Sequence, residues 1–297
     1  FGLINLSGNQ KEALKLLTNH ARRRGRDSSG FIAFHKNQYK AIRADYDVSR
    51  LRDGEADLLS ESEIILGHSR LITDGFLDNQ PVIREDIFVI HNGIITNCDS
   101  LWERHSSVQR KLSIDSEVLN GITLDLLSRS ADLDELASYI LENVEGAVSA
   151  LIGVPRLGKL LLISNNGSMY VGNFQGGLVI SSESFPLTQL GAKGVTQVLG
   201  GSHILQIPKS ENIETKDYRL DRPNLVPAFS KNMGSANLLE CTDVEVRRCS
   251  KCILPETMPF ISFDEKGVCN YCRNYKLRNI PKPKSQIFDL IEPYRDK

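Results

Sequence analysis

The hydrophobic positions of the chain follow two spacings, one typical of helices and one typical of strands. A polar stretch from Asn9 to Glu12 resembles a capping box, and apolar residues then recur with a helical period at Ala13, Leu16, Leu17 and Ala21. Residues 115–128 and 132–142 have the same spacing. The pattern therefore predicts three amphipathic helices.

Short apolar runs bounded by polar or glycine-containing segments predict strands. These runs lie at residues 1–6, 31–34, 64–70, 87–91, 147–154, 159–164, 168–171, 178–181 and 203–207. Asn92-Gly93 is a strong hairpin signal, so we expect a tight turn directly after the strand at 87–91. Strands on both sides of two helices favour an α+β fold with largely antiparallel sheets.

The periodicity divides the chain into four parts. We expect one domain at residues 1–222, a linker at 223–246, a four-cysteine unit at 247–275 and the start of a further domain at 276–297. The chain opens without Met on a strand-like segment and stops directly after a helix-like one. We therefore expect both ends to be cuts in a longer protein.

Composition narrows the class of protein. Of the 297 residues, 40% are hydrophobic and 25% are charged, which is typical of a soluble globular protein. The net charge of -1 gives no electrostatic reason to expect a nucleic acid or a membrane as a partner. No apolar stretch reaches the roughly 20 residues of a membrane helix, and no secretory signal opens the chain. We expect a cytoplasmic protein. The sequence leaves open whether the protein forms a homo-oligomer.

Four of the six cysteines form a metal-binding pattern. Cys249 and Cys252 make one C-x-x-C pair, Cys269 and Cys272 make another, and sixteen residues separate the pairs. Two such pairs can present four thiolates in the tetrahedron that zinc prefers, and Gly267 suits the turn into the second pair. Four sulfur ligands close the site, so we expect a structural zinc ion. An iron–sulfur centre and four metal-free thiols are the alternatives.

Basic residues outnumber acidic ones around these cysteines. Contact with a nucleic acid is one interpretation. We favour a solvated surface, or a face that docks against a phosphate-bearing partner domain. Cys98 and Cys241 have no other cysteine nearby in the sequence, and we expect both to be buried or half-buried thiols.

Four polar motifs stand in a fixed order in the first domain. They are RGRDSSG at 24–30, GHSRLITDG at 67–75, HNGIITN at 91–97 and SIDSEV at 113–118. Together they resemble the class II glutamine amidotransferase domain over about the first 220 residues. The resemblance implies an N-terminal-nucleophile hydrolase fold, a four-layer αββα sandwich, which the small zinc ribbon would follow.

The resemblance also implies a glutamine site. The side chain of Asn92 and the backbone N–H of Gly93 would donate hydrogen bonds to the oxyanion of the tetrahedral intermediate. Arg70 would bind the α-carboxylate of glutamine, and Asp115 would accept hydrogen bonds from its α-ammonium group. The same site would be lined by Thr73, Asp74 and Arg24. Asp74 departs from the related synthases, which often have His at this position.

Taken alone, these residue types also fit plainer roles. Asn92-Gly93 would be a hairpin turn, and Asp115 would be a helix N-cap. Arg70 would make a surface ion pair, and Arg24 would be an exposed arginine in a basic run.

The nucleophile of this family is an N-terminal cysteine in an opening of the Cys-Gly-Ile-Phe-Gly type. Matching this opening to Phe1-Gly2 places the cysteine three residues before Phe1, so the chain as written lacks it. We interpret the absence as truncation. The alternative is a degenerate, inactive domain.

Two further segments, RCSKCILPET at 248–257 and ISFDEKGVCNYC at 261–272, carry the cysteines. They resemble the opening of the N-acetyl sugar amidotransferases of surface-polysaccharide biosynthesis. In those enzymes an ATP-pyrophosphatase domain follows, with an S-G-G-x-D-S phosphate loop that does not occur in this sequence.

The two resemblances together predict a two-step function. The first domain would release ammonia from glutamine, and a downstream synthetase domain with ATP and Mg2+ would use it to amidate an acceptor, here a sugar. The protein would then be a transferase or a ligase. The zinc unit would be a rigid connector between the two domains. The alternatives are an inactive scaffold with a zinc-ribbon binding module and an asparagine-synthetase-like enzyme.

Overall fold

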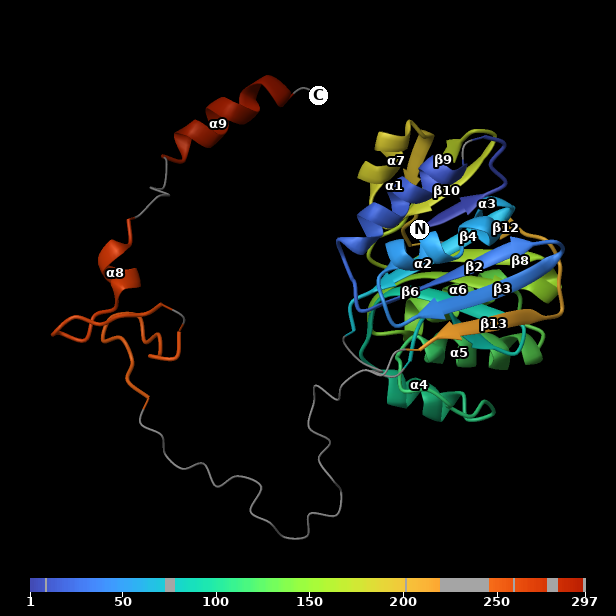
Figure 1. Cartoon of the computed structure of the whole chain (residues 1–297), viewed down its shortest axis with the longest axis horizontal. Helices are drawn as coiled ribbons and strands as arrows, with labels where there is room; N and C mark the ends of the chain where they lie inside the picture. Colours follow the sequence, from blue (N-terminus) through green and yellow to red (C-terminus); the bar gives the residue numbers. More distant parts are fainter. Residues whose placement is uncertain are drawn as a thin grey trace, which may run out of the picture. The chain divides into compact units, whose positions relative to one another are not determined.

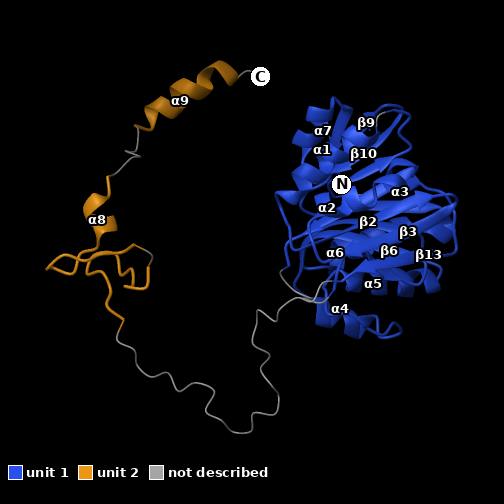
Figure 2. Ribbon diagram, in the orientation of Figure 1, with its two compact units in different colours: residues 1–223 blue, residues 224–297 orange. Residues whose placement is uncertain are grey.

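Two β-sheets form the centre of the first part of the chain (Figure 1). The computed structural model describes residues 1–8, 10–72, 78–200, 202–219, 246–258, 260–276 and 283–295. These residues divide into two units, Phe1–Pro223 and Asn224–Lys297 (Figure 2). The predicted linker at 223–246 lies almost entirely outside the described residues.

The larger sheet of the first unit has eight strands among the described residues, in the order β11-β9-β10-β1-β4-β2-β3-β13. Their bounds are β1 Gly2–Ile4, β2 Ser28–His35, β3 Gln38–Ala44, β4 Ile64–Arg70, β9 Tyr170–Phe174, β10 Gly177–Ser181, β11 Lys193–Gln197 and β13 Ile213–Tyr218. Neighbouring strands are antiparallel except at one edge, where β13 pairs with β3 in parallel.

The smaller sheet has five strands in the order β12-β8-β7-β6-β5, again counted among the described residues. Their bounds are β5 Val82–Arg84, β6 Ile87–Ile95, β7 Gly146–Val154, β8 Lys159–Ser164 and β12 Ser202–Gln206. All four pairings in this sheet are antiparallel.

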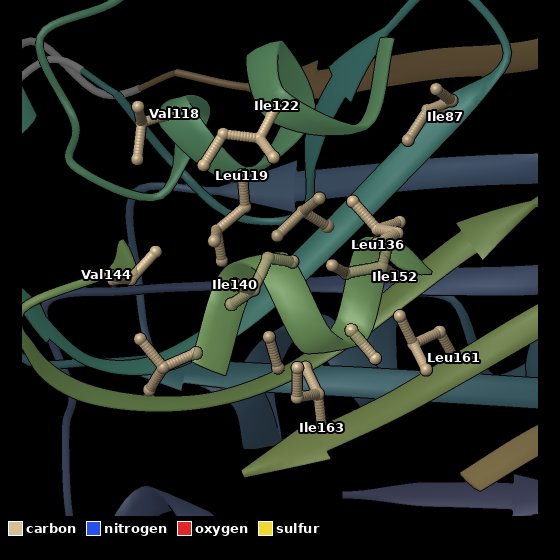
Figure 3. Close-up of a cluster of buried hydrophobic side chains, with 14 of the residues drawn as sticks. Ile87, Val118, Leu119, Ile122, Leu136, Ile140, Val144, Ile152, Leu161 and Ile163 are labelled. Carbon is tan, nitrogen blue, oxygen red and sulfur yellow. The ribbon is translucent and has the colours of Figure 1, made fainter. Parts of the chain in front are cut away.

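Helices cover the outer face of each sheet. The larger sheet packs against α1 Gln10–Arg22, α2 Val48–Gly54, α3 Ala56–Ser60 and α7 Ser184–Leu190. The smaller sheet packs against α4 Cys98–Arg104, α5 Glu117–Ser128 and α6 Leu133–Asn143. Figure 3 shows side chains of α5 and α6 in this core. The layers therefore run helix, sheet, sheet, helix, and the predicted α+β sandwich is confirmed.

The alternation of side chains along each strand explains why there are three separate cores. In β2, Phe31 and Ala33 face the helices while Ile32 and Phe34 face the other sheet. β6 alternates in the same way, with Val89 in the helix-facing core and Phe88 in the core between the sheets. Because successive side chains point to opposite faces, a strand without polar interruptions can supply two cores at once.

The predicted helices are present, with small shifts in their ends. α6 begins with a capping box in which the Asp132 side chain accepts hydrogen bonds from the backbone N–H groups of Asp134 and Glu135. α5 begins at Glu117, and its N-cap position is Ser116 rather than Asp115. The N-cap role of Asp115 is therefore wrong.

The hairpin predicted at Asn92-Gly93 is also wrong. Both residues lie inside β6 and pair with Ser149 and Val148 of β7. Gly93 has a φ of 152°, and a Cβ atom at this position would lie 1.8 Å from the carbonyl oxygen of Ala147. Close contact between strands, and not a turn, is the reason for glycine here.

The second unit contains short elements around the cysteines. Antiparallel bridges join Arg248 to Pro255 and Phe263 to Cys269. Its described helices are α8 Asn270–Asn274 and α9 Ser285–Ile291. Within the described part of the chain, no helix has the length and hydrophobicity that a bilayer crossing requires.

The core between the sheets predicts a measurable stability effect. Leu162 of β8 is fully buried there, whereas Leu157 is 42% exposed. We expect Leu162→Ala to lower the free energy of unfolding by about 2–5 kcal/mol, because it leaves a cavity in a packed core. Leu157→Ala is the matched control and should change it by less than about 1 kcal/mol. Denaturant unfolding measures both, and equal effects would contradict the three-core arrangement.

Candidate functional sites

An open cavity of about 430 Å³ lies where β4, β6 and the start of β1 come together. Its floor includes Ile90, Leu151 and Met169, which belong to the core between the sheets. Its wall contains every described residue that the sequence predicts for a glutamine site, together with the first residue of the chain: Phe1, Arg24, Arg70, Asn92, Gly93 and Asp115. Thr73 and Asp74 lie outside the described residues.

Arg70 is the last residue of β4 and only 4% exposed. Its guanidinium donates a hydrogen bond to the backbone carbonyl of Asp78. A buried guanidinium must be hydrogen-bonded to be tolerated, so its direction is set by such partners. Arg70 is therefore not a surface residue, which its plainer role would require.

Asp115 is 9% exposed and belongs to the turn before α5. Its Oδ2 accepts a hydrogen bond from the backbone N–H of Ile95 at 2.9 Å, and its Oδ1 accepts one from the Ser116 hydroxyl at 3.1 Å. These bonds fix a carboxylate in the cavity wall directly beside the end of β6.

A buried histidine that the sequence did not single out supports the same strand. The backbone N–H of His91 donates to Oε1 of Gln80 at 2.6 Å, and its ring Nδ1 lies 3.0 Å from the Ser116 hydroxyl. Asn92 and Gly93 follow directly, so His91 holds β6 at the point where the strand reaches the cavity. Its only sequence signal is its place before Asn92-Gly93.

Phe1 continues the pairing of β1 with β4. Its nitrogen donates to the Gly67 carbonyl at 3.1 Å, and its carbonyl accepts from the Gly67 N–H at 2.8 Å. Arg24 lies on the same cavity wall, where its guanidinium donates to the Ser182 hydroxyl at 2.7 Å and lies 3.6 Å from Oε1 of Glu183. Arg24 thus has partners at the cavity edge and is still 42% exposed.

The electrostatics of the cavity are shaped by its cations. Burial lowers the pKa of His68 to about 3, and the positive charges of Arg70 and Arg24 act in the same direction. The His68 imidazole is therefore neutral at pH 7. The cavity wall carries the guanidiniums of Arg24 and Arg70 and the carboxylates of Asp115 and Glu183, together with neutral donors and acceptors. Such an arrangement suits a zwitterionic ligand with a polar, uncharged end.

Comparison with known proteins gives the fold a name. No family profile matches the chain. In structure, the chain resembles the glutamine phosphoribosylpyrophosphate amidotransferase of B. subtilis, with a TM-score of 0.53 and 20% identity over 71% of this chain and 50% of that one. The first unit has the fold of a glutamine amidotransferase.

Sequence relatives point to the same family. A glutamine–fructose-6-phosphate aminotransferase (isomerizing) of Zymomonas mobilis is 27% identical over 201 residues, which is 63% of this chain and 33% of the relative. A 7-cyano-7-deazaguanine synthase of Saccharolobus solfataricus is 29% identical over 178 residues, or 55% of this chain and 37% of the relative. The chain spans about a third of the length of these relatives. They support a class II glutamine amidotransferase domain.

The second unit, which follows the first in the sequence, brings its four cysteines together. The sulfur atoms of Cys249, Cys252, Cys269 and Cys272 all lie within 4.8 Å of one another. Cys249 and Cys272 are 4.0 Å apart, and Cys252 and Cys269 are 3.6 Å apart. Four sulfurs around zinc at its usual bond length would be about 3.8 Å apart, so the cluster fits a small zinc site.

Backbone N–H groups stabilise negative charge on these sulfurs. Cys249 accepts hydrogen bonds from the N–H groups of Cys269 at 3.2 Å and Lys251 at 3.4 Å. Burial raises the pKa of the Cys249 thiol, but these hydrogen bonds outweigh it and bring the pKa to about 6. Gly267, with a φ of 75°, makes the predicted turn into the second pair. The pKa of the Cys272 thiol is raised instead, above all by its contact with the Cys252 sulfur. The four sulfurs together are placed so that they could hold a metal ion.

The cluster predicts metal binding that depends on each cysteine. We expect the purified protein to contain about one metal ion per chain, and Cys269→Ser to reduce this to near zero because it removes one of four ligands. Elemental analysis for zinc and iron measures the content. Cys98→Ser is the control, since Cys98 belongs to the first unit and should leave the content unchanged. Full metal content in Cys269→Ser would contradict a four-cysteine site.

Proposed function

We propose that the cavity binds glutamine and that the protein hydrolyses the side-chain amide to glutamate and ammonia. One observation carries the proposal: Arg70, Asn92, Gly93 and Asp115, from three separate segments of the sequence, line a single cavity beside Phe1. The amidotransferase fold and the names of the sequence relatives support it.

The amino-acid end of glutamine would be held by a pair of opposite charges. Arg70 would bind the α-carboxylate through two parallel hydrogen bonds, which the guanidinium geometry favours. Asp115 would accept hydrogen bonds from the α-ammonium group. Both side chains are largely buried, so their attraction to the ligand is screened less than it would be at the surface. Arg24, Thr73 and Asp74 would complete the site.

The amide end would lie against β6. The side chain of Asn92 and the backbone N–H of Gly93 would donate hydrogen bonds to the oxyanion. A thiol three residues before Phe1 would add to the amide carbon, ammonia would leave, and water would hydrolyse the resulting thioester. β1 is paired with β4 up to Phe1, so residues preceding Phe1 in a longer chain would start at the cavity wall.

The ammonia would serve an ATP-dependent amidation. We assign this step to a synthetase domain outside these 297 residues, with ATP and Mg2+ as its cofactors and a sugar as the acceptor. Zinc is the metal we propose for the second unit, because four thiolates leave no open position and suit a structural ion. The zinc unit would connect the two domains rigidly and couple glutamine hydrolysis to amidation.

The oxyanion role of Asn92 predicts a loss of turnover. We expect the chain preceded by Cys-Gly-Ile to release ammonia from glutamine, and Asn92→Ala to reduce kcat by about 100-fold or more with little change in KM, since the donor acts on the transition state. An ammonia-release assay measures both. Asn212→Ala, an exposed asparagine outside the cavity wall, is the control. No ammonia release from a folded, glutamine-binding protein would favour the inactive scaffold.

The carboxylate role of Arg70 predicts a loss of binding instead. We expect Arg70→Ala to raise the KM for glutamine by roughly 10- to 100-fold, because a charge-assisted bidentate contact is lost. Arg70→Lys should restore only part of the lost affinity, because an ammonium group cannot donate the two parallel hydrogen bonds that a guanidinium makes to a carboxylate. Arg52→Ala is the control, since Arg52 is half-buried, with 15% of its side chain exposed, and bonds to Asp53 and Thr18 away from the cavity. An unchanged KM in folded Arg70→Ala would refute the assignment.

A further inference from the structure

We propose that Asp78 is a positioning residue of the glutamine site, which orients the two charged groups that hold the amino-acid end of the ligand. This inference rests on the proposed function. Asp78 is half-buried and does not belong to the cavity wall. It would act through Arg70 and Asp115 and not by touching glutamine.

The backbone carbonyl of Asp78 sets the direction of Arg70. Arg70 ends β4, and its Nη1 atom donates a hydrogen bond to this carbonyl. A guanidinium is planar, so fixing one of its nitrogens restricts the plane in which the others can donate. The contact therefore limits how Arg70 can meet a carboxylate in the cavity.

The side chain of Asp78 fixes the turn that carries Asp115. Its Oδ2 accepts hydrogen bonds from the Ser113 N–H at 2.7 Å, the Ser113 hydroxyl at 2.7 Å and the Ile114 N–H at 3.2 Å. Hydrogen bonds to an ionised carboxylate are among the strong ones. Ser113 and Ile114 directly precede Asp115, so these three bonds set where the Asp115 backbone stands.

The residues after Asp78 tie the same segment to the rest of the site. Oε1 of Gln80 accepts from the backbone N–H of His91 at 2.6 Å, and its Nε2 donates to the Ser116 hydroxyl at 3.2 Å. Asn79 donates to Asp45 at 2.6 Å. Through Gln80, the segment that contains Asp78 is thus joined to β6, which carries the proposed oxyanion donors.

The two contacts of Asp78 can be separated by substitution. Asp78→Ala keeps the backbone carbonyl that Arg70 uses and removes only the carboxylate that holds the turn before Asp115. The loss should therefore fall on ligands that carry an α-ammonium group. A general structural role would instead weaken all ligands of the cavity by the same factor.

The test is calorimetric titration of the full chain with L-glutamine and with glutaramate, which is glutamine without its α-amino group. We expect Asp78→Ala to raise the Kd for glutamine about tenfold and to leave the Kd for glutaramate within about twofold. Asp78→Asn should fall between wild type and Asp78→Ala, because its amide oxygen still accepts hydrogen bonds without the charge. Asp132→Ala is the matched control, an aspartate that also accepts from two backbone N–H groups but caps α6.

The outcomes separate this inference from the function on which it rests. An equal loss for both ligands, or no loss for either, overturns the positioning role alone. Absence of glutamine binding in the wild-type chain overturns the proposed function and the positioning role with it. Should Asp78→Ala not fold, Ser113→Ala removes one of the three hydrogen bonds and carries the same comparison of ligands.

Discussion

The face-to-face packing of the two sheets is the constraint on which the rest of the first unit depends. Alternate residues of the facing strands, such as Ile32 and Phe34 on one side and Phe88 and Ile90 on the other, form a continuous apolar layer. This layer fixes the sheets relative to one another and brings the end of β4 opposite the end of β6. The cavity lies above this layer and inherits its floor from it.

Above this apolar floor, the charged groups of the cavity wall are held by hydrogen bonds within the protein. Arg70 and Asp115 are mostly buried, and each makes hydrogen bonds to the protein. Burying such charges costs free energy, which the fold recovers only through good hydrogen-bond geometry. The hydrogen bonds that Asp78 accepts from Ser113 and that Gln80 donates to Ser116 are consistent with this requirement, because they fix the polar groups around Asp115 in advance of any ligand.

The sequence predicted the parts of the fold that local physics determines. α1 and α6 have amphipathic spacing, and α6 also has its capping box, so both could be located within a few residues. β3 and β13 were missed, since Gln38–Ala44 contains Lys and Arg among its apolar residues and Ile213–Tyr218 is mostly polar and exposed. Strand pairing supplies their stability, and the pairing partner is invisible to local spacing.

The candidate site shows the same limit. The four motifs brought Arg70, Asn92, Gly93 and Asp115 forward as members of one site, but the geometry of Gly93 was misread as a turn. Its closeness to Ala147 depends on β7, more than fifty residues later. Asp78 gave no signal, because its proposed role consists of contacts with Arg70 and with the turn before Asp115, and the sequence alone does not show that these meet. A family resemblance identifies ligand-contacting residues more readily than it identifies the residues that position them.

The parallel strand β13 has a consequence for the behaviour of the protein in solution. It occupies the outer edge of the eight-stranded sheet, and its side chains include Glu214, Lys216 and Asp217. Lys216 and Asp217 form ion pairs with Glu55 and Arg43. Without β13, the hydrogen-bonding groups of β3 would be open to strands from other molecules. Charged side chains on an edge strand disfavour pairing with a strand of another molecule, and here they come from a segment that lies shortly before the second unit in the sequence.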